Sequence, residues 1–151
     1  MRPNLRLLLV SEPFGPSLGS AAAARRLAEG LHEGGLPEPD VLELPGGLGA
    51  GAELQELLER EHFTPRLDDA RALLIATGRL DGGMLQDTPA FELATRARQG
   101  GVPCYAVAGH NGLDSFQERI LDLGLVLEAG APRTLRAAGR TLAEEVLAGI
   151  R

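Results

Sequence analysis

Short, almost continuously apolar runs alternate along the chain with longer segments in which apolar residues recur every three or four positions. The first pattern is typical of strands buried on both faces of a sheet, and the second is typical of amphipathic helices. We expect strands over Leu5–Ser11, Val41–Leu44, Ala72–Thr77, Val102–Ala108 and Leu125–Ala129. We expect helices over Ser20–His32, Glu53–Glu61, Thr88–Gly100, Asp114–Asp122 and Thr134–Leu147.

Strands and helices that alternate in this way form a parallel sheet with helices on both faces. The predicted fold class is therefore α/β: a three-layer, Rossmann or flavodoxin-like fold around a five-stranded, mostly parallel sheet. One domain over residues 1–151 is expected, because only the segment His62–Asp69 interrupts the rhythm. In such folds, ligands bind beyond the carboxyl ends of the strands, where the direction of winding reverses. In the flavodoxin-like strand order this point lies between the first and third strands, so the loops Glu12–Gly19 and Gly78–Leu85 should meet there, with Gly109–Asn111 alongside.

The loop after the third strand holds the strongest candidates for ligand contact. Gly78 begins it, Arg79 suits the binding of a carboxylate or phosphate, and Asp81 suits the acceptance of a ligand hydroxyl or its proton. The alternative is an internal ion pair between Arg79 and Asp81 that only holds the loop in shape. His110 follows the fourth strand at the same edge, where it could act as a base or hydrogen-bond a ligand.

Ser17 and Ser20 stand where the first loop meets the first helix. Their hydroxyls and the backbone N–H groups of a helix N-terminus can bind an anion. The alternative is that Ser20 only caps the helix. Thr88 is expected to cap its own helix, and Asp114 forms a capping-box pattern with a glutamine three residues later.

Composition narrows the classes of function. The chain has 151 residues and a net charge of −6, and all 15 basic residues are arginines spread along the sequence. Nucleic-acid binding needs a basic face, so it is not expected. The apolar run Leu5–Val10 is too short to cross a bilayer or to form a signal peptide, so we expect a cytoplasmic protein without a membrane partner.

Metal and dinucleotide sites are also not expected. The three histidines are too scattered to form a recognisable metal site, and Cys104 is expected to be a small buried thiol. Glu12 could bind Mg²⁺ at the end of the first strand, but we expect a solvated loop carboxylate. The segment Gly47–Ala52 fits the pattern G-x-G-x-x-A, yet the next strand lacks the acidic residue that an NAD site needs at its end.

Five segments occur in an order found in a known family: Phe14–Gly19 before an Ala-rich helix, Leu44–Ala50, Ala70–Asp81, Met84–Pro89 and Gly101–Gly109. Together they resemble bacterial glycerate kinases, over most of residues 5–60 and nearly all of 67–148. The resemblance covers only the discontinuous terminal domain of that family, because the large inserted domain has no counterpart at His62–Asp69. It implies a sugar-acid kinase that uses ATP and Mg²⁺ as cofactors.

The departures from the family fall on the residues of phosphoryl transfer. Gly15 stands at the position of a lysine, Pro45 and Leu48 at those of acidic residues, and Asp87-Thr88 at that of a Gly-Lys pair. Phosphoryl transfer depends on cations that neutralise the moving phosphoryl group. We therefore expect a glycerate kinase relative that lacks kinase activity alone and binds a small anionic metabolite, with Asp81 as the candidate for any catalytic residue.

Two alternatives stay open. One is an interaction or structural protein without a ligand, because loss of a domain leaves a formerly covered surface that a homo-oligomer could bury. The other is a divergent but active sugar-acid kinase, which follows from the inherited fold alone.

Overall fold

The computed structural model describes residues 4–83 and 85–150, so Met84, part of one segment of the family resemblance, lies outside it. The strands are β1 (Leu8–Ser11), β2 (Asp40–Glu43), β3 (Leu73–Asp81), β4 (Cys104–Gly112) and β5 (Leu123–Glu128). The helices are α1 (Ser20–Glu33), α2 (Ala52–Arg60), α3 (Phe63–Asp68), the short 3₁₀ helix η1 (Leu85–Asp87), α4 (Pro89–Gln99), α5 (Ser115–Ile120) and α6 (Pro132–Ala148).

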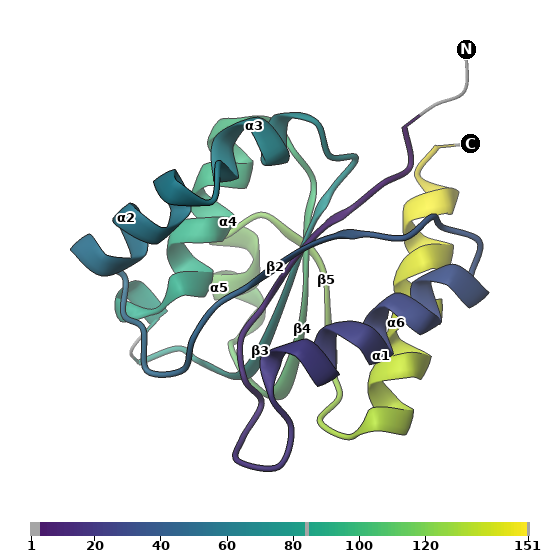
Figure 1. The fold of residues 1–151 in the computed structure, drawn as a ribbon, viewed down its shortest axis with the longest axis horizontal. Coiled ribbons are helices and arrows are strands. Elements are labelled where there is room, and N and C mark those ends of the chain that lie inside the picture. Colours follow the sequence, from purple (N-terminus) through teal and green to yellow (C-terminus); the bar gives the residue numbers. More distant parts are fainter. Residues whose placement is uncertain (1–3, 84, 151) are drawn as a thin grey trace.

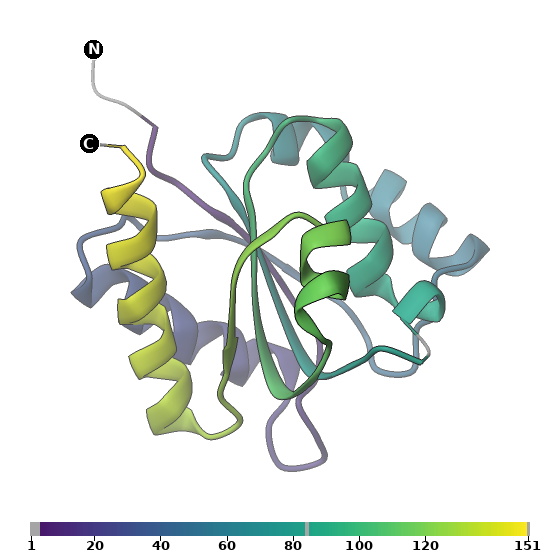
Figure 2. The ribbon, with the colours of Figure 1, turned by 180° about the vertical axis from the view of Figure 1, so that it is seen from behind.

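The strands form one parallel sheet in the order β2-β1-β3-β4-β5. Helices α1 and α6 cover one face, and α2 to α5 cover the other, as both ribbon views show (Figures 1 and 2). The prediction of a three-layer, flavodoxin-like α/β fold is confirmed. From β1 the chain first adds β2 on one side of it and then adds β3 on its other side, so the direction of winding reverses between β1 and β3.

The predicted ends of β3 and β4 were wrong. Both strands continue four residues past Thr77 and Ala108, and their extensions pair in register from Arg79 with His110 onward. The segment predicted as the loop Gly78–Leu85 is therefore strand as far as its fourth residue. A Cβ atom on Gly109 would lie 2.6 Å from the carbonyl oxygen of Gly78. These glycines mark a close approach of two backbones within the sheet, which is another use of glycine in strands.

The segment His62–Asp69, where the predicted rhythm breaks, contains the short helix α3. His62 takes a left-handed backbone conformation, with φ of 57°, which turns the chain out of α2. Arg66 then ties α3 to β2, because its Nε and Nη2 atoms donate to the two carboxylate oxygens of Asp40 at 2.9 and 2.8 Å. A pair of charge-assisted hydrogen bonds of this geometry fixes orientation as well as distance.

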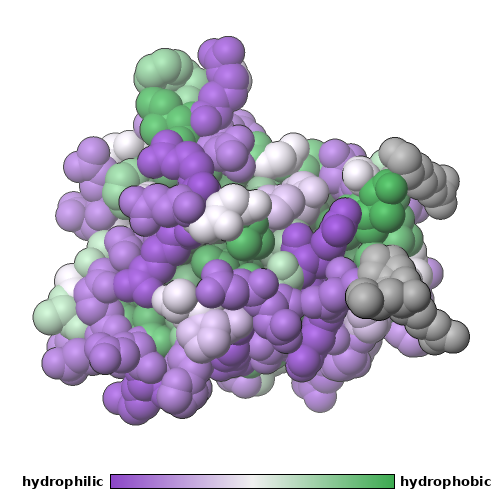
Figure 3. All heavy atoms as spheres, turned by 90° about the horizontal axis from the view of Figure 1, so that it is seen from above, coloured by the Kyte–Doolittle hydropathy of each residue, from purple (hydrophilic) through white to green (hydrophobic). Residues whose placement is uncertain are grey.

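Aliphatic side chains fill the space on both sides of the sheet in two clusters, and Cys104 is buried in one of them, as expected. The outer surface seen from the amino ends of the strands is mostly hydrophilic, with apolar atoms in small separate areas (Figure 3). Within residues 4–83 and 85–150, none of the helices has both the length and the apolar character to cross a bilayer.

The two helices on the α1/α6 face approach each other closely because both carry glycine at the crossing. A Cβ atom on Gly30 would lie 2.0 Å from the carbonyl oxygen of Arg136, and one on Gly139 would lie 2.5 Å from that of Leu27. Contacts this short leave no room for even a methyl group, since the obstructing atoms are backbone.

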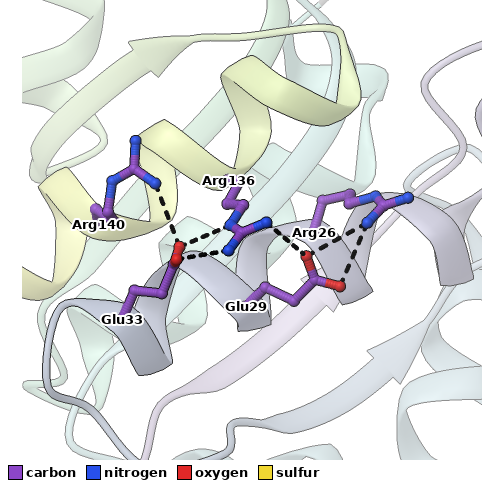
Figure 4. Close-up of polar contacts among 5 residues, drawn as sticks. All are labelled: Arg26, Glu29, Glu33, Arg136 and Arg140. Atoms are coloured by element: carbon purple, nitrogen blue, oxygen red, sulfur yellow. Dashed lines mark hydrogen bonds and ion pairs between the residues drawn. The ribbon is translucent and has the colours of Figure 1, made fainter.

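Charged side chains cross the outer side of the same helix pair (Figure 4). Glu33 accepts from Nε and Nη2 of Arg136 at 2.8 and 2.6 Å and from Nη1 of Arg140 at 3.2 Å. Arg26 lies one turn away and pairs with Glu29 at 3.3 Å. The hydrogen bonds from Arg136, with help from Arg140, lower the pKa of Glu33 from its ordinary value of 4.5 to about 2.

We expect Gly30→Ala to destabilise the protein by about 1–3 kcal/mol, since the added methyl must push α1 away from α6. Urea unfolding followed by circular dichroism measures the change. Gly49→Ala is the matched control, because its nearest neighbour would lie at an ordinary 3.6 Å. Equal stability of the two variants would show that the helices are not closely packed at Gly30.

The depressed pKa of Glu33 also predicts a pH dependence. Ionised Glu33 favours the folded state above pH 4.5, and this contribution is lost as the pH falls towards about 2. We therefore expect the Tm of the wild type to fall more steeply across this window than that of Glu33→Gln. Glu144→Gln, which changes an exposed glutamate of α6 outside these ion pairs, should keep the wild-type slope.

Candidate functional site

The β1–α1 loop and β3 meet at the carboxyl edge of the sheet, where the winding reverses. The backbone N–H of Glu12 donates to the carbonyl of Ala76 at 2.8 Å. Two residues further along both segments, a Cβ atom on Gly78 would lie 2.9 Å from the carbonyl oxygen of Phe14. The two segments therefore lie against each other, as predicted, and Figure 1 shows the loop projecting beyond the lower edge of the sheet.

Ser17 does not lie at the start of α1. The loop closes on itself before the helix, because Phe14 N–H donates to the Leu18 carbonyl at 2.8 Å and Leu18 N–H donates to the Gly15 carbonyl at 3.2 Å. Ser17 is exposed within this tight turn. Ser17 therefore belongs to the turn that precedes the cap residue Gly19 and does not cap α1.

Ser20 is the first residue of α1, and Gly19 takes the capping position. The prediction that Ser20 caps the helix is therefore wrong. Its hydroxyl instead donates to the Glu43 carboxylate of β2 at 3.2 Å, and its carbonyl accepts from the Ser11 hydroxyl at 2.9 Å. The N-terminus of α1 has no side-chain cap, so the N–H groups of its first turn point towards this edge without a side-chain acceptor.

Arg79 and Asp81 lie on the extension of β3, on either side of the buried Leu80. Their closest atoms, Nε and Oδ2, are 3.8 Å apart, and their side chains are 67% and 45% exposed. Asp81 also accepts from the N–H of Gly83 at 3.0 Å. The internal ion pair expected as the alternative is present, but a solvent-exposed pair of this length contributes little stability.

His110 is the register partner of Arg79 on the extension of β4. Its Nδ1 lies 3.9 Å from Oε2 of Glu128, which also accepts from the N–H of Asn111 at 2.9 Å. The edge formed by β3, β4 and β5 thus brings together Arg79, Asp81, His110 and Glu128. Glu128 was missed in the sequence, although its position at the end of a predicted strand was a usable signal.

Glu12 differs from the expected solvated carboxylate. Burial raises its pKa, and a hydrogen bond with the buried Thr77 hydroxyl opposes the rise in part. The β2–α2 loop packs nearby, since a Cβ on Gly46 would lie 3.5 Å from the ring of Pro13. A carboxyl with a raised pKa next to the point where the winding reverses is a candidate functional group.

The residues at this edge do not fit ATP with Mg²⁺. In the described part of the chain, no three His, Cys, Asp or Glu side chains converge as metal ligands. The guanidinium of Arg79 lies beside the carboxylate of Asp81, and the carboxylate of Glu128 lies beside His110 on the neighbouring strand. Carboxylates repel the several negative charges of a triphosphate, and no lysine exists in the chain to offset them.

We expect Glu12→Gln to raise the Tm near neutral pH, because glutamine avoids burying a charge and can keep the bond with Thr77. A raised pKa means that stability falls as the pH rises above the ordinary value of 4.5. The gain in Tm should therefore be present at about pH 7 and absent at about pH 4. Glu53→Gln, at an exposed position of α2, is the control. A gain that does not change with pH would contradict this account of Glu12.

Comparison with known proteins does not extend this picture. No protein-family model matches the chain, and no curated protein matches it at a significant level.

Proposed function

We propose that the chain is a relative of the glycerate kinases that binds a small anionic metabolite at the carboxyl edge of its sheet and is not a kinase by itself. The observation that carries the proposal is the contact between Phe14 and Gly78 where the winding reverses. This contact brings the uncapped start of α1 to the edge that also carries Arg79. Open α/β sheets bind their ligands at such edges.

Arg79 is the residue proposed to hold the anion. Its side chain is largely exposed, and its long contact with Asp81 is one that a ligand carboxylate can replace. A guanidinium binds a carboxylate through two parallel hydrogen bonds, which gives direction as well as affinity. His110, beside it in register, supplies a further N–H donor from its imidazole ring.

The surrounding carboxylates limit the charge of the ligand. Asp81 and Glu128 flank the two basic side chains, so a ligand with several negative charges would be repelled. A single carboxylate can be neutralised by Arg79 alone. Glu12, which is hydrogen-bonded to the buried Thr77 at the same edge of the sheet, offers a polar group suited to a ligand hydroxyl. These features favour a small hydroxy acid over a nucleotide.

The absence of kinase activity follows from the groups that occupy the family's lysine and acidic positions. Gly15 lies in the tight turn before α1, and Asp87 lies in η1. Neither can neutralise a moving phosphoryl group. Loss of one such contact costs a factor of about 10²–10³ in rate in other enzymes, and several are replaced here.

Thermal unfolding with added D-glycerate, 3-phosphoglycerate or ATP with Mg²⁺, each at about 10 mM, tests the binding proposal. A ligand that binds only the folded state raises the Tm. We expect a rise with D-glycerate, a smaller one with 3-phosphoglycerate, and no rise with D-glycerate in Arg79→Gln. Arg60→Gln, at the far end of α2, is the matched control and should respond as the wild type does.

Two results would contradict the proposal. If the Tm of Arg79→Gln rises as much as that of the wild type, Arg79 does not bind the ligand. If neither acid raises the Tm of the wild type, the protein does not bind a ligand of this class. Glycerate-dependent formation of ADP at rates of about 1–100 per second, as active kinases show, would instead establish the divergent-kinase alternative.

A further inference from the structure

Helix α5 exposes two large apolar side chains one turn apart. Phe116 is 63% exposed and Ile120 is 47% exposed, and among the residues the structure describes only Ile150, at 36%, is a further exposed side chain of this kind. Residues four apart lie on the same side of a helix. Apolar side chains gathered on one helix face, unlike single scattered ones, mark an interaction surface.

A hollow of about 510 Å³ lies beside these side chains, between α5 and the segment formed by η1 and α4. Phe116 and Ile120 of α5 line it together with Phe91 of α4. Leu85 and Leu121 contribute further apolar surface to the lining. Polar side chains, among them Gln86 and Gln117, also line the hollow. The exposed pair and the hollow, in which apolar and polar surfaces are mixed, are here called the α5 face.

Carboxylates lie at the N-terminal end of the α5 face, and two arginines lie at its C-terminal end together with the exposed Asp122. Asp87 precedes α4 and Asp114 caps α5, so both carboxylates lie at the N-terminal ends of these helices. Arg98 and Arg119 lie in the last turns of the same helices, and Arg98 Nη1 donates to the Ile120 carbonyl at 2.8 Å. Both helices cover the same sheet face and connect parallel strands, so they run in the same direction (Figure 2).

This distribution of charge suits a second copy of the same surface. In a two-fold symmetric dimer, every contact occurs twice: if one residue of the first copy touches a second residue of the other copy, the reverse contact is also made. If two α5 helices lie antiparallel, the carboxylate end of one face meets the arginine end of the other at both ends of the contact. A surface of one charge sign would repel its own copy, whereas this one attracts it.

We propose that the chain forms a two-fold symmetric homodimer through the α5 face. Phe116 of each copy packs into the hollow of the other, against Phe91 and Leu85, and the contact continues over the exposed side of α4. Buried aromatic side chains at the centre of an interface carry much of its binding energy. The carboxylate and arginine ends select the antiparallel orientation of the two helices.

Sedimentation velocity across a dilution series of the wild type, up to about 100 µM, tests the proposal. We expect a monomer–dimer equilibrium, and the double variant Phe116→Ser, Ile120→Ser should raise its Kd by a factor of about 100 or more. The changed side chains are exposed, so the monomer should unfold at its usual temperature. Ile150→Ser, at the exposed apolar side chain outside the α5 face, is the control and should leave the Kd unchanged.

Variants that exchange the charges at the two ends of the α5 face distinguish this arrangement from other modes of association. Arg119→Glu should weaken the dimer by a factor of about 10, and adding Asp87→Arg should recover part of the loss, because opposite charges again face each other. A monomer throughout the dilution series overturns the proposal. So does a dimer whose Kd is unaffected by the Phe116 and Ile120 changes, or one in which the second charge change weakens association further.

Discussion

Strand β1 and the first half of β3 are buried on both faces, and the rest of the structure depends on this constraint. The side chains of Leu8–Val10 and Leu73–Ala76 are apolar in both directions, so helices must cover each side of the sheet. On one side several helices share the task, whereas only α1 and α6 are available on the other. The glycines at their crossing allow these two to lie close enough to close that side.

The same constraint explains which parts of the fold could be predicted. Buried strands and amphipathic helices leave strong periodic signals, so the layers and the sheet order followed from the sequence. The extensions of β3 and β4 did not, because Gly78 and Gly109 suggested a loop where two backbones pass closely instead. Helix α3 was missed since its position depends on the ion pair between Arg66 and Asp40, which are far apart in the sequence.

The candidate site was predictable in the same partial way. The grouping of Arg79, Asp81 and His110 at one edge follows from the order and the parallel direction of β3 and β4, which periodicity indicates, although both strands continue further than predicted. The behaviour of Glu12 follows from how neighbouring loops pack over it, and no local pattern carries that information. Likewise, the choice of Gly19 rather than Ser20 as cap depended on Glu43, which lies on another strand and accepts the serine hydroxyl.

The pairing of α1 with α6 joins two helices that lie far apart in the sequence, since the paired residues Glu33 and Arg136 are 103 positions apart. During synthesis, β1 and α1 leave the ribosome long before α6. Part of the apolar surface on that side must therefore stay uncovered until α6 has been made. Folding of this half is a late event with large loop-closure entropy, and the newly made chain depends on protection from aggregation until then.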